Sequence, residues 1–86
     1  MKSISLHRNF EKKYSKLPKK IKDAFKERRN LFLADIHHPL LDVHMLHGKR
    51  KGYQSFNVTG NIRVVYKETK EIFLLVDIGT HGELYS

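Results

Sequence analysis

The chain has 86 residues, a length that predicts a single domain over residues 1–86 with a modest hydrophobic core. Because it contains no cysteine, it forms neither a disulfide framework nor a thiolate metal site. Seventeen Lys and Arg against nine Asp and Glu give a net charge of +8, which favours a polyanionic partner: nucleic acid, an anionic membrane surface or an acidic protein. No apolar run is long enough to span a bilayer, and the start of the chain lacks the apolar region of a signal peptide. We therefore expect a cytoplasmic protein without a membrane partner.

The first half of the chain has the pattern of a strand followed by two helices. Apolar and polar residues alternate over residues 3–7, which predicts a half-buried strand. Asn9 is a suitable N-cap for a first helix, and Pro18 suits the first turn of a second, where its missing N–H costs nothing. The apolar stripes of the two helices are Phe10, Tyr14 and Leu17, then Ile21, Ala24, Phe25, Leu31 and Phe32. We expect a helical hairpin, followed by a loop over residues 37–48.

The second half has the period of β-structure. Residues 55–58 and 62–67 alternate, and Thr59-Gly60-Asn61 between them supplies turn chemistry. After a polar turn at residues 68–71, residues 72–77 are almost continuously apolar, which is typical of a central strand buried on both faces. The predicted order is β-α-α-β-β-β, an α+β fold. In it a helical hairpin packs on one face of a small sheet, made of the N-terminal strand and a three-stranded antiparallel meander.

Arg63 lies inside a predicted strand, on the opposite side from its apolar neighbours. If those neighbours face the helices, Arg63 points out of the open face of the sheet, together with Asn57 across the hairpin and Asn61 near the turn. A guanidinium held on a strand is a fixed, bidentate ligand for phosphate. The alternative is a solvated arginine on a strand face.

The last segment carries two further candidates. His81 follows a predicted Gly-Thr turn directly after the central strand, and Tyr85 lies four residues later. Loops held by a rigid sheet often carry active-site groups, and histidine exchanges a proton near neutral pH. Taken alone, His81 is equally a surface or structural histidine, and Tyr85 a packing residue.

Four histidines within eleven residues raise the question of a zinc site: His37, His38, His44 and His47. The chain has no cysteine, Pro39 interrupts the helical spacing, and the neighbouring acids, Asp35 and Asp42, are ordinary loop residues. We therefore predict no metal and no cofactor.

The cations fall into two groups. Ten of the seventeen lie between Arg8 and Arg29, and a denser group is Lys49-Arg50-Lys51. Most of the helical cations are expected to form the solvated face of the amphipathic hairpin. The alternative is that they dock on RNA and add salt-dependent affinity without sequence preference.

Four motifs in the second half point to a known family. They are His44-Met45-Leu46-His47-Gly48, Lys51-Gly52-Tyr53, Arg63-Val64-Val65-Tyr66-Lys67, and Gly79-Thr80-His81 followed by Leu84-Tyr85. These motifs resemble toxins of the RelE/ParE superfamily, and most closely its YafQ-like mRNA interferases. The resemblance implies the toxin of a type II toxin–antitoxin system, a metal-independent endoribonuclease that cuts mRNA in the ribosomal A site. It also implies a cognate antitoxin, mRNA and the ribosome, through its rRNA, as partners.

Carried over by position, the resemblance assigns roles for attack of an RNA 2′-OH on the adjacent phosphate. His44 and His81 are the acid–base groups. Tyr85 takes the place of a terminal aromatic residue that orients or stacks on a base. Arg63 corresponds to a strand arginine of RelE-like members that holds the scissile phosphate, whereas YafQ-like members tend to have an aliphatic residue there.

The substrate-binding residues implied by the resemblance are Lys49, Arg50 and Lys51, which grip the RNA backbone, and Asn57 and Asn61. The two asparagines stand where YafQ-like toxins tend to have histidine and aspartate. Neither exchanges a proton at neutral pH. The acid–base chemistry therefore rests on the two histidines, and an inactive member that keeps the fold is an open alternative.

Two other functions remain open from the sequence. ParE-type members share the fold but inhibit DNA gyrase by binding, a function that does not require His44, His81 and Tyr85 together. A non-enzymatic RNA-binding module is less well supported, since the chain has neither the aromatic pair of an RRM strand nor a Gly-x-x-Gly loop.

Overall fold

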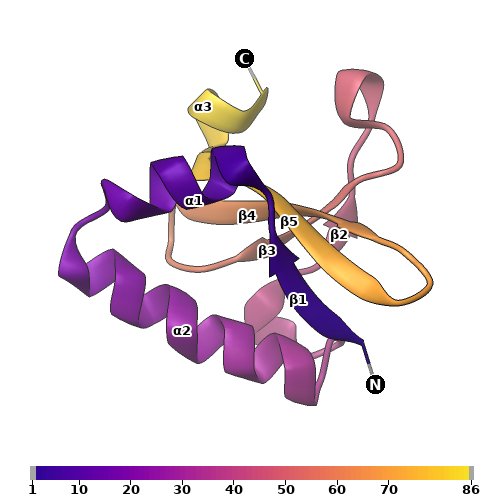
Figure 1. Cartoon of the computed structure of the whole chain (residues 1–86), viewed down its shortest axis with the longest axis horizontal. Coiled ribbons are helices and arrows are strands. Elements are labelled where there is room, and N and C mark those ends of the chain that lie inside the picture. The colour runs from indigo at the N-terminus through magenta and orange to yellow at the C-terminus, as the bar shows by residue number, and fades with distance from the viewer. Residues whose placement is uncertain (1, 86) are drawn as a thin grey trace.

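The computed structural model describes residues 2–85, with Tyr85 described by its backbone alone (Figure 1). Strand β1 (Ser3–Leu6) is followed by helices α1 (Arg8–Ser15) and α2 (Lys19–Ala34). The 3-10 helix η1 (Pro39–Leu41), strand β2 (His44–Met45) and the 3-10 helix η2 (Gly48–Arg50) come next. The chain then forms strands β3 (Gln54–Asn57), β4 (Ile62–Glu68) and β5 (Ile72–Thr80), and helix α3 (His81–Tyr85).

The five strands form one sheet in the order β1-β5-β4-β3-β2. Strand β1 is parallel to β5, because the two helices carry the chain across before the antiparallel strands begin. The α+β class and the hairpin of helices are confirmed. The sheet is mixed, however, and the predicted three-stranded meander is extended by β2 at its edge. Strand β2 lies in the predicted loop, since a two-residue strand is too short to show a period.

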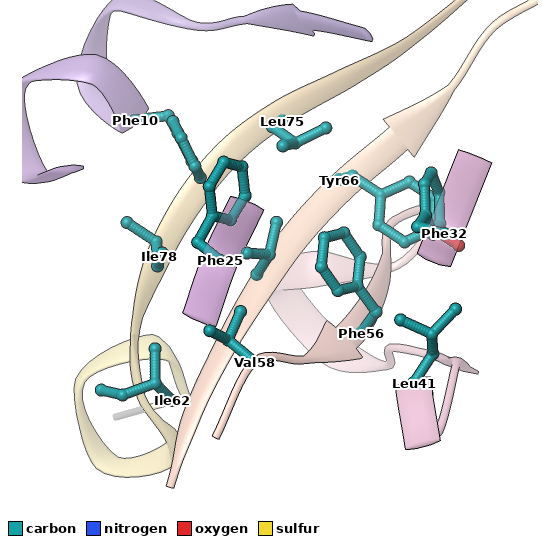
Figure 2. Close-up of a cluster of buried hydrophobic side chains, with 11 residues drawn as sticks. Phe10, Phe25, Phe32, Leu41, Phe56, Val58, Ile62, Tyr66, Leu75 and Ile78 are labelled. Carbon is teal, nitrogen blue, oxygen red and sulfur yellow. The ribbon is translucent and has the colours of Figure 1, made fainter. Parts of the chain in front are cut away.

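The main core lies between α2 and the sheet (Figure 2). The predicted stripe of α2 is confirmed, with Phe25 and Phe32 buried. The Phe32 ring lies 4.8 Å from the Phe56 ring and 5.0 Å from the Tyr66 ring, centroid to centroid. Such aromatic pairs contribute about 0.5–1.5 kcal/mol each beyond the area they bury. Burial also raises the pKa of the Tyr66 hydroxyl, which donates a hydrogen bond to Gln54 Oε1 at 2.6 Å.

Helix α1 begins two residues earlier than its sequence predicts. The N-cap is His7, whose Nδ1 accepts a hydrogen bond from the Asn9 backbone N–H at 3.0 Å, so the prediction of Asn9 as the cap is wrong. His7 still continues the pairing of β1 with β5, because its backbone N–H donates to the Leu75 carbonyl at 2.8 Å. The first helical residue, Arg8, therefore directly follows the last hydrogen bond between this segment and β5. Pro18 occupies the N-cap of α2.

A second, smaller cluster covers part of the opposite face of the sheet. It consists of buried Leu46, Val65 and Leu84, with Tyr53 and Val76 partly buried beside them. The face that was predicted to be open is therefore partly closed by the segment after β2 and by α3. Within residues 2–85, none of the helices combines the length and the apolar composition needed to span a lipid bilayer.

Candidate active site

Arg63 is the centre of a hydrogen-bonded network on this second face. Strand β4 places it opposite Asn57 on β3 and Gly79 on β5. Its Nε and Nη2 donate to Ser55 Oγ at 3.1 and 3.0 Å, and its Nη2 donates to the Asp42 carbonyl at 2.7 Å. Nη1 lies 3.5 Å from the Asp42 carboxylate. The side chain is only 11% exposed, so Arg63 lies under the segment at Asp42 and is not a solvated arginine.

His44 lies directly beside this guanidinium. It belongs to edge strand β2, pairs with Ser55 on β3 and is exposed. Its Nδ1 is 3.1 Å from the Asp42 carbonyl oxygen and 3.3 Å from Arg63 Nη2. Asp42 adopts the left-handed conformation, with a φ of 46° and a ψ of 50°, and this turn brings its carbonyl to both side chains. The structure thus brings two of the predicted catalytic residues, His44 and Arg63, into contact.

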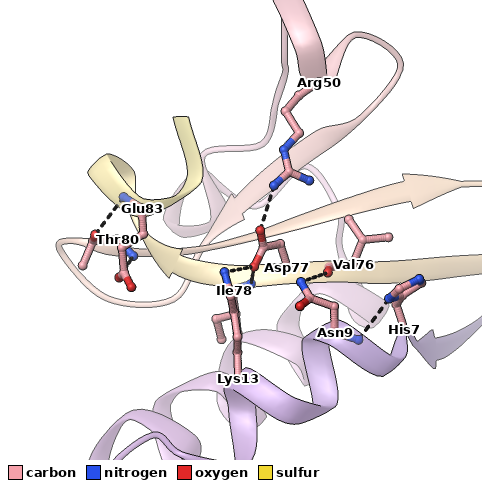
Figure 3. Close-up of polar contacts among 9 residues, drawn as sticks. All are labelled: His7, Asn9, Lys13, Arg50, Val76, Asp77, Ile78, Thr80 and Glu83. Atoms are coloured by element: carbon pink, nitrogen blue, oxygen red, sulfur yellow. Dashed lines mark hydrogen bonds and ion pairs between the residues drawn. The ribbon is translucent and has the colours of Figure 1, made fainter. Parts of the chain in front are cut away.

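His81 is the first residue of α3 and is exposed. The predicted Gly-Thr turn before it is wrong, because Gly79 and Thr80 are the last two residues of β5. The Glu83 N–H donates to Thr80 Oγ1 at 3.2 Å and the Thr80 N–H donates to Glu83 Oε1 at 2.9 Å (Figure 3). This reciprocal pair is a capping box, and its Thr-x-x-Glu signature is visible in the sequence. It fixes the point at which the chain turns from the strand into the helix that carries His81.

Glu83 lies close to the sheet because Gly79 has no side chain. A Cβ at Gly79 would lie 3.2 Å from Glu83 Oε1, closer than nearly all such contacts. The hydrogen bond from the Thr80 backbone N–H is the main cause that lowers the pKa of the Glu83 carboxyl below its ordinary value, and the Thr80 side chain adds to it. Glu83 therefore holds α3 in place as a carboxylate at neutral pH.

The three remaining polar or aromatic candidates have different surroundings. Asn57 is half-buried opposite Arg63, and its Oδ1 is buried without a hydrogen-bond partner among the described residues. Asn61 is exposed in the turn before β4, where its Oδ1 accepts from Thr59 Oγ1 at 3.4 Å. The side chain of Tyr85 lies outside the described part of the chain.

The predicted cationic segment is anchored by a residue that sequence reasoning missed. Arg50 Nη2 donates to Asp77 Oδ2 at 2.7 Å, and Lys13 Nζ donates to Asp77 Oδ1 at 2.7 Å (Figure 3). The Asp77 residue is only 4% exposed. Lys49 and Lys51, in contrast, are exposed. The available signal was an acidic residue at the end of an apolar strand, since carboxylates are almost never buried unless paired.

The candidate residues form a strip across one end of the sheet. His44 lies on β2 and His81 directly after β5, with Arg63 and Asn57 on the strands between them. Neighbouring strands are about 4.8 Å apart, and His44 is in register with Ser55, Val65 and Asp77, four residues before His81. The backbones at the two ends of the strip are therefore about 14 Å apart across the strands and about 13 Å apart along them. By backbone position Arg63 therefore lies between the two histidines.

A groove of about 740 Å³ opens beside β2. Its walls are formed by Ile36, His37, His38, Pro39, Asp42, Val43, His44, Met45, Gln54 and Glu68. Of the predicted site residues only His44 lines it, so the groove is not the centre of the strip. Among residues 2–85 there is no group of three or more His, Asp or Glu side chains arranged to hold a metal ion.

The fold is shared with solved structures of bacterial and archaeal toxins. The structure of YafQ from E. coli is similar over 100% of both chains, with a TM-score of 0.81 and 23% sequence identity. The E. coli DinJ–YafQ complex gives 0.78 and 23%, again over 100% of both chains. An archaeal RelE–RelB complex from Pyrococcus horikoshii OT3 gives 0.74 and 21%, over 94% of this chain and 96% of that one. No family model and no curated protein sequence matches the chain. The chain therefore has the fold of the YafQ and RelE toxins.

Proposed function

We propose that this chain is the toxin of a type II toxin–antitoxin system, of the RelE/ParE superfamily and closest to the YafQ-like members. It acts as a metal-independent endoribonuclease that cleaves mRNA in the ribosomal A site. The observation that carries the proposal is the contact of His44 with Arg63, whose side chain is only 11% exposed, at 3.3 Å, on a fold shared with YafQ along the whole chain. An acid–base group held beside a fixed cation is what cleavage at a phosphate requires.

The reaction begins when the RNA 2′-OH attacks the adjacent phosphate, and it ends when the 5′-oxygen leaves. One histidine takes the proton of the hydroxyl and the other gives a proton to the leaving oxygen, each contributing about 10²–10⁴-fold. His44 and His81 are the candidates for these two roles, because the strand order places their backbones on either side of Arg63. Tyr85 orients or stacks on a base.

The remaining charge serves to bind RNA. Lys49 and Lys51 are exposed on the segment that Arg50 ties to the sheet, and they contact the phosphates that flank the cut. Asn57 and Asn61 lie at the same end of the sheet and contact the RNA through their amides. The net charge of +8 adds attraction to ribosomal RNA that weakens with salt.

A cognate antitoxin is the second partner. The solved complexes of YafQ with DinJ and of RelE with RelB each pair a toxin with an antitoxin. An antitoxin with an acidic segment would be attracted to the cationic segment Lys49-Arg50-Lys51 of this chain. Since ribosomes are the site of action, the protein works in the cytoplasm.

The test is the lesion that the purified protein produces. Labelled mRNA is incubated free and in ribosomes stalled with an empty A site, and a gyrase–DNA reaction is run in parallel. We expect ribosome-dependent cuts in the mRNA that survive EDTA, with a 2′,3′-cyclic phosphate on one side and a 5′-hydroxyl on the other. Intact RNA together with cut DNA trapped on gyrase would replace the proposal with ParE-like inhibition, and no lesion of either kind would reject both.

A further inference from the structure

Both hydrogens of Arg63 Nη2 make short contacts with oxygen acceptors. This nitrogen has two N–H groups. One points the same way as Nε–H, and both donate to Ser55 Oγ at 3.0 and 3.1 Å. The other donates to the Asp42 carbonyl at 2.7 Å. His44 Nδ1, at 3.3 Å, is therefore the longest of the three contacts of Nη2 and can share one of these hydrogens only in a three-centre bond.

The shorter of the two contacts of His44 Nδ1 is with an acceptor. The Asp42 carbonyl oxygen lies 3.1 Å from Nδ1, and a carbonyl offers two lone pairs, enough for both Arg63 and His44. A carbonyl accepts only, so Nδ1 is the donor. In the neutral imidazole one nitrogen is protonated and the other is not, so the lone pair is on Nε2.

We infer that Arg63 is a positioning residue that holds the Asp42 peptide, and that this peptide fixes neutral His44 as the Nδ1–H tautomer with Nε2 as the proton acceptor. The role of His44 that follows is the general base that takes the proton of the 2′-OH. This inference rests on the proposed function for its catalytic meaning, whereas the tautomer itself follows from the hydrogen bonds. It replaces the role that the resemblance implied for Arg63, that of a direct ligand of the scissile phosphate.

The surroundings of Arg63 support positioning over phosphate binding. Its side chain is 11% exposed, and Ser55, its anchor, is completely buried. An arginine that binds phosphate needs free N–H groups on its guanidinium, but the Nε and Nη2 groups of Arg63 already donate to Ser55 and to the Asp42 carbonyl. Asp42, with its left-handed φ of 46°, adopts a conformation that non-glycine residues avoid unless their neighbours fix it. The bond from Arg63 to the Asp42 carbonyl is one such restraint, and the bond from the Asp42 N–H to the Pro39 carbonyl at 3.2 Å is another.

The substitution Arg63→Lys separates the two roles. Lysine keeps the positive charge but cannot bind Ser55 and the Asp42 carbonyl together, because it lacks the planar fork. A positioning role predicts that Arg63→Lys loses cleavage about as severely as Arg63→Ala, by roughly 10²-fold, since a misplaced base costs about that much. A direct phosphate contact predicts that lysine retains much of the rate.

The tautomer is measured without any cleavage. Long-range ¹H–¹⁵N correlation NMR of histidine-labelled protein, above the pH at which imidazole titrates, shows which ring nitrogen carries the proton. We expect Nδ1–H for His44 in the wild type, and a shift towards the Nε2–H form favoured by free imidazole in Arg63→Lys. Arg28→Lys is the matched control, because Arg28 also donates to a backbone carbonyl, that of Leu40 at 2.6 Å, and it lies on α2.

The outcomes are distinct. An Nε2–H wild-type His44, or an unchanged Nδ1–H signal in Arg63→Lys, overturns the inference. If Arg63→Lys does not fold, Ser55→Ala removes the hydroxyl that anchors the fork and gives the same comparison. A correct tautomer shift in a protein that cuts no RNA would confirm the arrangement and reject the proposed function.

Discussion

The substitution Asp77→Asn tests whether the second face of the sheet depends on a buried carboxylate. Asp77 joins β5 to α1 through Lys13 and to η2 through Arg50, with both contacts at 2.7 Å. Asparagine has nearly the same shape, so the change removes the charge and leaves no cavity. It offers one amide oxygen in place of two carboxylate oxygens, so at least one of the two cations loses its partner.

The structure sets the size of the effect. A hydrogen bond to a charged group contributes about 1.5–3 kcal/mol, but the Lys13 and Arg50 side chains are 40% and 31% exposed and regain water when released. We therefore expect the free energy of unfolding to fall by about 2 kcal/mol, which is well below the sum of two full bonds. In a domain of this size that corresponds to a fall in Tm of about 8–16 °C.

Thermal unfolding followed by circular dichroism measures this loss, and Asp23→Asn is its matched control. Asp23 pairs with Lys19 at 3.0 Å on the exposed face of α2, so its substitution should leave Tm near the wild-type value. Amide hydrogen exchange should also rise at residues 48–51 in Asp77→Asn, because the segment loses its anchor. Equal Tm values for Asp77→Asn and the wild type, or an equal loss in both variants, would refute the reasoning.

Three further predictions concern the core, the end of the sheet and the cationic segment. Phe32→Ala should lower the free energy of unfolding by about 3–5 kcal/mol in urea titration, because three aromatic rings lose their contact with it, whereas Leu33→Ala, at an exposed neighbour, should change little. Because hydrogen bonds lower the pKa of Glu83, its contribution to stability is complete above the ordinary glutamate pKa and is lost as the pH falls through the lowered pKa. Hydrogen exchange at the Thr80 amide should therefore rise over that acid range. The same rise with falling pH in a Glu83→Gln protein would contradict this. Lys49→Ala should weaken ribosome binding and reduce its salt slope by about 1 while leaving cleavage at saturation unchanged, and a slope equal to that of the wild type would exclude a phosphate contact.

The regular elements were predictable because their patterns are long. The apolar stripe of α2 extends over more than two helical turns, and the alternation on β4 extends over several residue pairs. Both patterns are confirmed. The strand at His44 and Met45 was not predictable, because its two residues are set by pairing with β3 and have no period of their own. The same holds for the parallel pairing of β1 with β5, since partners distant in the chain leave no local pattern.

The candidate site was predictable by residue type more than by arrangement. His44 and Arg63 were both identified, but their common partner is a backbone carbonyl, and no side-chain motif reports that contact. Asp42 was overlooked because a left-handed non-glycine residue has no fixed sequence signature. The capping box of Thr80 and Glu83 could have been found from the sequence, and it would have replaced the predicted turn before His81 with the start of a helix.

The most direct test of the central claim compares RNA ends produced by the wild type and by His81→Ala in stalled ribosomes with an empty A site. His81 is exposed at the start of α3, and thermal unfolding of His81→Ala establishes that the variant is folded. His37→Ala is the matched control, since His37 is also exposed but lies outside the strip. The account predicts A-site cuts by the wild type and His37→Ala, and a loss of at least about 10²-fold in His81→Ala. Cuts by His81→Ala at the wild-type rate would contradict the assignment of His81 to the chemistry, and an absence of cuts by the folded wild type would contradict the account as a whole.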